Sequence, residues 1–134
     1  MLEKSSAQPE KAAMRISHEM HLAIVEIAGP VHWHENRESW LAKAARSAGV
    51  NYRTAKGFFY REYTNPNAVD VERIREARTR LHSHNESLRH AATLDSAADA
   101  LASIDETFHR AEIDRLRDVA GSIRRQALGQ GVTA

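Results

Sequence analysis

The side chains that could do chemistry are densest between residues 51 and 60, where amide, phenol and cationic groups recur at helical spacing. If this segment is a helix with about 100° per residue, it has two unlike sides. An arc of about 140° holds the cationic and hydrogen-bonding residues and one glycine: Tyr52, Arg53, Lys56, Gly57 and Tyr60. The opposite side is apolar, with Ala55, Phe58 and Phe59. A helix that reads DNA needs this partition, because one side packs on the protein while the other enters a major groove about 12 Å wide.

We predict contacts to bases, or to adjacent phosphates, from four residues of this segment: Asn51, Tyr52, Arg53 and Lys56. Arg53 is expected to read a guanine edge, and Gly57 is expected to let the helix approach the DNA closely. Asn51 has an equally good interpretation as the N-cap of the helix. The two tyrosines, Tyr52 and Tyr60, could instead stack on the bases of a single strand or an RNA.

Charge is segregated along the chain. The total is only +1, from 19 basic and 18 acidic residues, which by itself indicates no nucleic-acid partner. Between His34 and Tyr63, however, six basic residues stand against three acidic ones, a balance of +3, whereas Leu94 to Thr107 carries −4. The arginines of residues 73–89 are mostly balanced by acids. We therefore predict phosphate contacts from residues between positions 37 and 61: Arg37, Lys43, Arg46, Tyr60 and Arg61.

Catalysis and metal binding receive little support. The chain has no cysteine, and no nucleophile, phosphate loop or carboxylate pair stands at a diagnostic spacing. Eight histidines include the pairs His18 and His21, His32 and His34, and His82 and His84. A zinc site without cysteine needs three or four side chains converging from separate elements. We expect no enzyme activity, no cofactor and no metal, with a metal-dependent sensor as the alternative.

The three prolines, at positions 9, 30 and 66, divide the chain into a tail and three helical regions. Apolar spacing predicts a helix over 10–28 that ends at Gly29-Pro30, helices over 36–48 and 51–60, and a turn over 64–67. A helix over 70–92 follows, with Asn67 or Asp70 as its N-cap, and capping residues over 93–96 predict a break. The last helix is expected over 96–127, ending at Gly129. Because nothing alternates with period two, the predicted fold is all-α.

Residues 40–58 carry a further pattern. Ala45 is followed four positions later by Gly49, then by Val50, and Ala55 and Phe58 stand six and nine positions after the glycine. The segment, at about 41–60, resembles the helix-turn-helix of bacterial and phage DNA-binding transcriptional regulators. In that family a small residue lies where the two helices cross, and a glycine takes a left-handed turn. The resemblance implies that Val50 plugs the turn into the core and that the second helix enters the major groove. A branched aliphatic residue is usual where this chain has Ala55, and a large apolar one where it has Phe58.

The domain organisation follows from these elements. We expect a flexible tail over 1–9, a DNA-binding head over 10–67, a helical extension over 68–128 and a second tail over 129–134. The expected core of the head includes Trp33, Trp40, Phe58 and Phe59. The apolar seam of the last helix is expected to pack internally or to form a homodimer: Ala98, Leu101, Ile104, Phe108, Ala111, Leu116, Val119 and Ile123. About 30 helical residues span about 45 Å, longer than such a head is wide, so a second copy is the simplest cover.

The sequence thus predicts sequence-specific double-stranded DNA binding by a homodimer, in prokaryotic transcription regulation. Dimeric binding implies an inverted-repeat site with half-sites about 34 Å apart. No segment is apolar enough for a membrane span, since Glu26 breaks the longest run, Leu22 to Ile27, and a cytoplasmic, nucleoid-associated protein is expected. The alternative is a helical protein-interaction module, of adaptor or antitoxin-like kind, without specific DNA binding.

Overall fold

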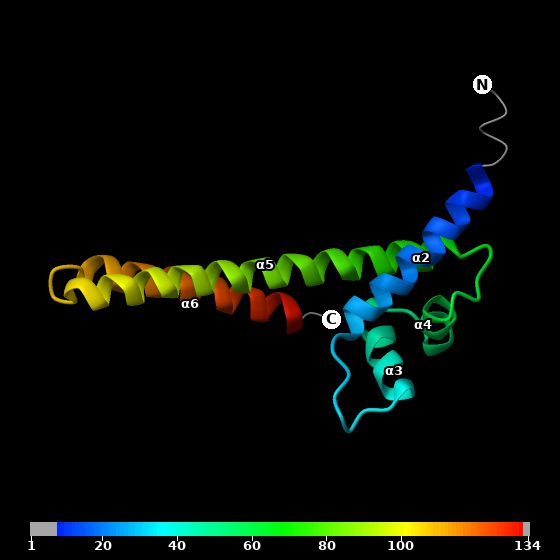
Figure 1. Cartoon of the computed structure of the whole chain (residues 1–134), viewed down its shortest axis with the longest axis horizontal. Coiled ribbons are helices and arrows are strands. Elements are labelled where there is room, and N and C mark those ends of the chain that lie inside the picture. Colours follow the sequence, from blue (N-terminus) through cyan, green and yellow to red (C-terminus); the bar gives the residue numbers. More distant parts are fainter. Residues whose placement is uncertain (1–7, 133–134) are drawn as a thin grey trace. The chain divides into compact units, whose positions relative to one another are not determined.

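The computed structural model describes residues 8–132, and the side chains of residues 11–129. These residues form five α-helices and no strand, which confirms the all-α prediction (Figure 1). The helices are α2 (Gln8–Ala28), α3 (Arg37–Ala48), α4 (Tyr52–Phe59), α5 (Ala68–Asp105) and α6 (Arg110–Val132). None of the described helices is both long and apolar enough to cross a membrane. Most of the tail expected over 1–9 lies outside the described residues.

The chain divides into two compact units, the first reaching Arg80 and the second beginning at Leu81. We call the first unit, with α2, α3, α4 and the start of α5, the head. The second unit, with the rest of α5 and α6, is the hairpin. The contacts of the head thus continue through the first turns of α5, beyond the boundary at residue 67 that composition suggests.

The head is built on large buried side chains. Met20 and Ile24 of α2, Leu41 of α3 and Ile74 of α5 are fully buried, and Phe58 of α4 joins them. Trp40 lies in the same core and donates its indole N–H to the Gly29 carbonyl oxygen at 2.8 Å, which satisfies its polar atom. Trp33 was expected in the core, but it lies almost fully exposed in the loop between α2 and α3.

Two ion pairs join α2 to α5 within the head. Arg75 forms a two-pronged pair with Glu19, both N–O distances being 2.8 Å, and Arg78 forms another with Glu26 at 3.0 Å. The hydrogen bond from Arg75 lowers the pKa of the Glu19 carboxyl, against a smaller opposing effect of burial. These pairs fix the start of α5 against α2 from the solvent side of the core.

The start of α5 matches one of the two predicted caps, because Asn67 accepts from the Val69 amide at 2.8 Å. The break predicted over 93–96 is wrong: α5 runs without interruption to Asp105. Thr93 bonds back to the Arg89 carbonyl oxygen, and Asp95 pairs with Arg124 of α6, so neither side chain caps a helix end. These polar groups find partners that do not require the helix to end.

The turn lies instead at Asp105, whose carboxylate accepts from the Phe108 amide at 3.0 Å before α6 begins. Helix α6 then runs back along α5 (Figure 1) and continues through Gly129 to Val132, so the helix end predicted at Gly129 is also wrong. Residues 133 and 134 of the expected second tail lie outside the described residues.

The interior of the hairpin is mostly alanine. Its buried residues recur at intervals of seven along each helix: Ala91 and Ala98 on α5, and Ile113, Ala120 and Ala127 on α6. The predicted seam places only Ala98 correctly in this interior. Ile104 and Phe108 are 73% and 80% exposed, Ala111 and Val119 are also exposed, and Leu101, Leu116 and Ile123 are partly buried. Small residues occupy the contact between the helices, and the larger ones lie beside it.

Candidate nucleic-acid interface

Helices α3 and α4 are joined by a turn of three residues, Gly49 to Asn51. Gly49 adopts the left-handed conformation, with φ of 73°, and its amide and that of Val50 both donate to the Ala45 carbonyl oxygen. These bonds satisfy carbonyl groups left open at the end of α3. Asn51 then begins α4 by accepting from the Thr54 amide at 2.8 Å. The left-handed glycine and the Asn51 cap are both as predicted.

The packing of the turn follows the same pattern. Ala45 is buried in the head core, and Val50 is half-buried against it. On α4, Ala55 and Phe58 are buried where the family pattern expects apolar residues. The inward side of α4 is thus fixed by apolar residues that cannot hydrogen-bond through their side chains. The other side of the helix faces solvent.

Gly57 does not lie on that solvent side, contrary to our prediction. It is buried, and a Cβ atom at this position would come within 2.6 Å of Cζ and 2.8 Å of the hydroxyl of Tyr63. The Tyr63 ring also packs edge-on against Phe58, with 5.0 Å between ring centroids. The glycine therefore makes room for Tyr63 rather than for DNA. Nothing within α4 indicates this contact, because Tyr63 lies in the following loop.

The solvent side of α4 carries Arg53 and Lys56, both exposed, and at its end Tyr60, which is 47% exposed. Their spacing of three and four residues places them along one side of the helix. Tyr52 is half-buried and packs against the head core. Of the four predicted base-contacting residues, Arg53 and Lys56 are exposed and Tyr52 is the least accessible. Asn51 is exposed but uses its side-chain oxygen as a cap, leaving its amide nitrogen as a donor.

Arg61 follows α4 in an unusual backbone conformation. Its φ of 57° is left-handed, a region in which a non-glycine residue costs about 1–2 kcal/mol. The Glu62 amide donates to the Gly57 carbonyl oxygen and the Arg61 amide to that of Phe58, so Arg61 occupies the place where helices commonly use glycine. Its side chain is exposed, two residues beyond the end of α4.

The remaining predicted phosphate ligands differ in their surroundings. Arg46 is exposed in the last turn of α3, and exposed Arg37 lies over the Phe59 ring, 5.3 Å from its centroid. Lys43 is less available, because its ammonium lies 3.3 Å from the Glu35 carboxylate. The His32 amide also donates to Glu35, and this hydrogen bond, followed by that from Lys43, lowers the pKa of the Glu35 carboxyl.

Two arginines of α5 hold the turn between α3 and α4. Arg73 donates to the Gly49 carbonyl oxygen at 3.3 Å, and Arg80 donates to that of Ser47 at 3.4 Å. Cations near the last carbonyl groups of a helix offset the negative end of its dipole. The sequence gives no indication of these contacts, because 24 and 33 residues separate the partners.

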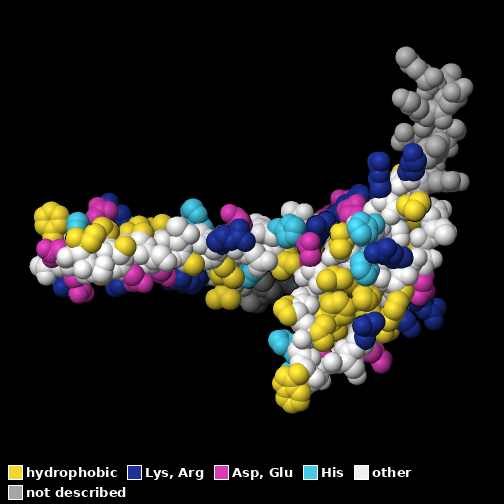
Figure 2. All heavy atoms as spheres, in the orientation of Figure 1, with side chains coloured by type: hydrophobic (Ala, Val, Ile, Leu, Met, Phe, Trp, Pro, Cys, Tyr) yellow, Lys and Arg dark blue, Asp and Glu magenta, His cyan; other side chains and the backbone are white. Residues whose placement is uncertain are grey.

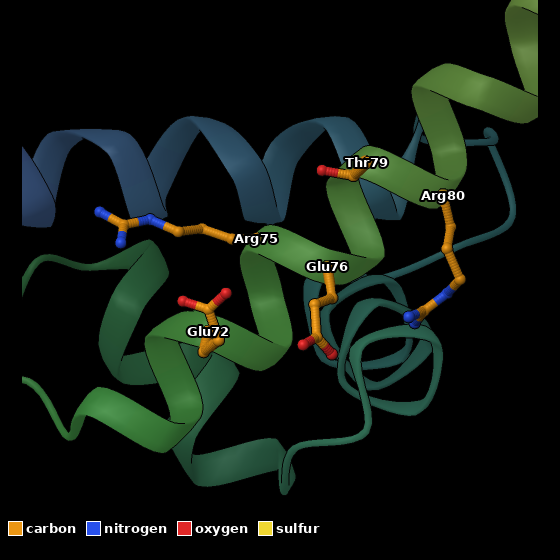
Figure 3. Close-up of a pocket in the computed structure, with 5 residues that line it drawn as sticks. All are labelled: Glu72, Arg75, Glu76, Thr79 and Arg80. Atoms are coloured by element: carbon orange, nitrogen blue, oxygen red, sulfur yellow. The ribbon is translucent and has the colours of Figure 1, made fainter.

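A shallow groove beside these arginines offers no comparable site. It is lined by acidic and basic side chains of α5: Glu72, Arg75, Glu76, Thr79 and Arg80. Figure 3 shows these side chains leaving the helix in different directions, with Arg75 extending along α2. Arg75 is paired with Glu19, and Arg80 donates to the Ser47 carbonyl oxygen. The groove therefore does not present several free side chains of the same charge to a ligand.

Histidines form no metal site within residues 11–129, where no group of three or more potential ligands converges. His21 stacks on Phe59, with 5.0 Å between ring centroids, and its Nδ1 contacts the Phe59 carbonyl oxygen. His32 and His34 stack on each other in the exposed loop before α3. His84 contacts the Ala127 carbonyl oxygen within the hairpin. These histidines thus make separate packing and hydrogen-bond contacts rather than converging on one point.

Similarity to known proteins does not assign the site. No protein-family model matches the chain, and no curated protein or solved structure shows significant similarity to it. The site is therefore defined by its own geometry: a short helix whose exposed side is cationic, positioned by a glycine turn and two arginines of α5.

Proposed function

We propose that the head binds double-stranded DNA sequence-specifically, with α4 in the major groove. One observation carries the proposal: α4 buries Ala55 and Phe58 while presenting Arg53 and Lys56 to solvent. A groove-reading helix requires this division, since the same short element must be held by the protein and be accessible to bases. The resemblance of residues 41–60 to bacterial and phage regulators supports the same function.

The proposed roles follow the exposure of each side chain. Arg53 and Lys56 contact bases, Arg53 through the paired acceptors of guanine, and Asn51 and Tyr52 contribute from the start of α4. Arg37, Arg46, Tyr60 and Arg61 bind phosphates. Lys43 does so only by exchanging its Glu35 partner for a phosphate, so we expect its contribution to be the smallest.

We further propose that the protein acts as a homodimer in prokaryotic transcription regulation, on the chromosome in the cytoplasm. Two heads then read an inverted repeat whose half-sites lie about 34 Å apart. The predicted dimerisation residues, Leu101, Ile104, Phe108, Leu116, Val119 and Ile123, are all at least partly accessible on the hairpin. No cofactor, metal or catalytic step is needed for this function.

The test is a mobility-shift titration of the full chain on random duplex DNA at two salt concentrations. We expect binding at low salt that weakens steeply as salt rises, because phosphate contacts release counterions. Absence of binding at low salt by the folded protein would refute the proposal and favour the protein-interaction alternative. Preference for a single-stranded competitor would favour the stacking alternative.

Two variants separate the roles once a preferred site has been selected from random duplexes. Arg53→Ala should lower affinity for the selected site by about fivefold to 150-fold, corresponding to about 1–3 kcal/mol, and relax the preference at one base pair. Arg46→Ala should weaken binding to all sequences and reduce the salt slope by about one. Arg125→Ala, an exposed arginine of the hairpin, is the charge-matched control and should leave both unchanged.

A further inference from the structure

The two long sides of the hairpin differ in chemistry. One side is closed by ion pairs between the helices, Asp99 with Arg117 at 3.3 Å and Asp95 with Arg124. Taking buried Ala91 as the inward direction of α5, Asp95 and Asp99 lie about 40° and 80° to one side at 100° per residue. Leu94 and Leu101 lie about 60° and 80° to the other side.

Helix α6 has the same division. Taking buried Ile113 as its inward direction, Arg124 and Arg117 lie about 20° and 40° to one side, and Leu116 and Ile123 about 60° and 80° to the other. Because the helices are antiparallel, equal directions of rotation meet on the same side of the pair. On the same side, Ile104 and Val119 lie farther round, at about 140° and 120° from the inward direction of their helices. The large residues opposite the ion pairs therefore share one surface, the apolar face: Leu94, Leu101, Ile104, Leu116, Val119 and Ile123.

The apolar face is accessible, and its six members are uncharged, with exposed Glu112 on the same side of α6 nearer the turn. Ile104 and Val119 are 73% and 45% exposed, and the other four members are partly buried. Figure 2 shows hydrophobic side chains on the hairpin surface and at its turn. A face with no cationic member is unsuited to DNA phosphates. Its residues also follow a heptad pattern, with 94 and 101 on α5, and 116 and 123 on α6, each seven apart.

The pattern matches a second copy of the same face. The ion pairs set Leu101 about level with Leu116, and Leu94 about level with Ile123. A two-fold axis that lies in the plane of the face, parallel to the helices and midway between them, sets α5 of one copy over α6 of the other. Large aliphatic residues then lie on large aliphatic residues, Leu101 on Leu116 and Leu94 on Ile123. Two-fold dimers require this self-complementarity, because each copy presents the same surface to the other.

We infer that two copies of the chain dock through their apolar faces and form a four-helix bundle from two hairpins. The alanine interior supports this partner, since a hairpin that buries mainly methyl groups gains little from its own packing. The second contact surface supplies the large side chains that the interior lacks. The inference identifies the surface of the homodimer in the proposed function, but it does not depend on the head binding DNA.

The test measures the mass of the full chain in solution without DNA, by sedimentation over a range of concentrations. We expect a species of twice the 15.0 kDa chain mass. Ile104→Glu and Val119→Glu should each weaken dimerisation at least tenfold, because each puts a charge into the proposed contact. The helical circular dichroism should be retained, because both residues are exposed in the single chain. Leu128→Glu is the matched control: Leu128 is 63% exposed, lies on the ion-pair side of α6 and should leave the dimer intact.

A second measurement uses the lack of cysteine in the chain. Val119→Cys treated with a short bismaleimide should give a covalent dimer, whereas Asp118→Cys, exposed on another side of α6, should not. A monomer at every concentration would overturn the inference and indicate that a different protein covers the face. A dimer that both glutamate variants leave intact would overturn it as well. Either result leaves the DNA titration of the head free to succeed or fail separately.

Discussion

The head and the hairpin place their large side chains oppositely. The head encloses Met20, Ile24, Leu41 and Ile74 completely. The hairpin encloses Ala91, Ala98, Ala120 and Ala127, with Ile113 as the one large residue among the buried positions of residues 81–129. Full burial of a leucine-sized side chain contributes about 1.5–3 kcal/mol, against about 0.8 kcal/mol for one methylene. The head therefore has a core of large side chains, and the hairpin has an interior of small ones, which is why we propose that a second surface covers it.

The chain allows the two regions to be measured separately. Both tryptophans, Trp33 and Trp40, belong to the head, so fluorescence reports on that unit. Helical circular dichroism reports on both units. Substitutions in one region can therefore be assigned to it by comparing the two transitions.

The largest effect is expected from the head core. Leu41→Ala should lower the free energy of unfolding of the head by about 2–5 kcal/mol, because it removes buried methyl groups and leaves a cavity. Urea denaturation followed by tryptophan fluorescence measures the change. Leu22→Ala, a partly exposed position on α2, should change it by no more than about 0.5 kcal/mol. Equal losses in both variants would contradict the packing described for the head.

A smaller effect is expected from enlarging the hairpin interior. Ala98→Leu should destabilise the hairpin by about 1–3 kcal/mol, since the interior has no space for the larger side chain. The loss should appear in thermal melts by circular dichroism while the fluorescence transition is nearly unchanged. Ala100→Leu, on an exposed side of α5, is the control and should be tolerated. If Ala98→Leu stabilised the hairpin, the contrast between the two interiors would be wrong.

Substitutions at Arg61 test whether this cationic residue lowers the stability of the head. Arg61→Gly should raise the free energy of unfolding of the head by up to about 1 kcal/mol, because glycine adopts positive φ without strain but loses more backbone entropy on folding. The same variant should bind duplex DNA more weakly and with a smaller salt slope. Arg61→Ala separates the effects, since it removes the charge and keeps the strain. A glycine variant that is more stable and binds DNA unchanged would exclude Arg61 from the interface.

The smallest effect concerns pH and the Glu19–Arg75 pair of the head. The folded pKa of Glu19 is below its usual 4.5, so its contribution is present above that pH and is lost as the pH falls through the folded pKa. Both partners are partly exposed, and we expect Glu19→Gln to cost about 0.5 kcal/mol or less at pH 7. Urea midpoints of the two proteins should converge as the pH falls to about 3. The control, Glu76→Gln on the exposed side of α5, should leave the urea midpoint at pH 7 nearly unchanged.

Local side-chain chemistry predicted the helix–turn–helix segment best. Gly49 and Asn51 act on amides and carbonyl groups a few residues away, so the helix ends they define could be located without knowledge of the tertiary fold. Gly57 could not be placed correctly, because its surroundings depend on Tyr63, which the following loop brings back over α4. The α5 arginines that hold the turn were inaccessible to sequence reasoning for the same reason.

The hairpin shows the opposite difficulty. Side chains that can cap a helix occur both at residues 93–96 and at Asp105. The sequence alone does not determine at which of these two places the helix ends. Partners on α6 and on the preceding turn decide it. Burial was predicted from side-chain size, which places Trp40 and Phe58 correctly in the head but misplaces Trp33, and it misassigns the hairpin, where alanine is inside.

If the head binds DNA as we propose, the contact between Gly57 and Tyr63 also constrains how its target preference could evolve. Four consecutive or nearly consecutive positions of α4 are committed to packing: Thr54, Ala55, Gly57 and Phe58. Any side chain added at Gly57 would displace Tyr63, so this position cannot acquire a new base contact by a single substitution. A lineage that changed its preferred DNA site would have to do so mainly through residues 53, 56 and 60, and comparison of close variants should find their differences concentrated there.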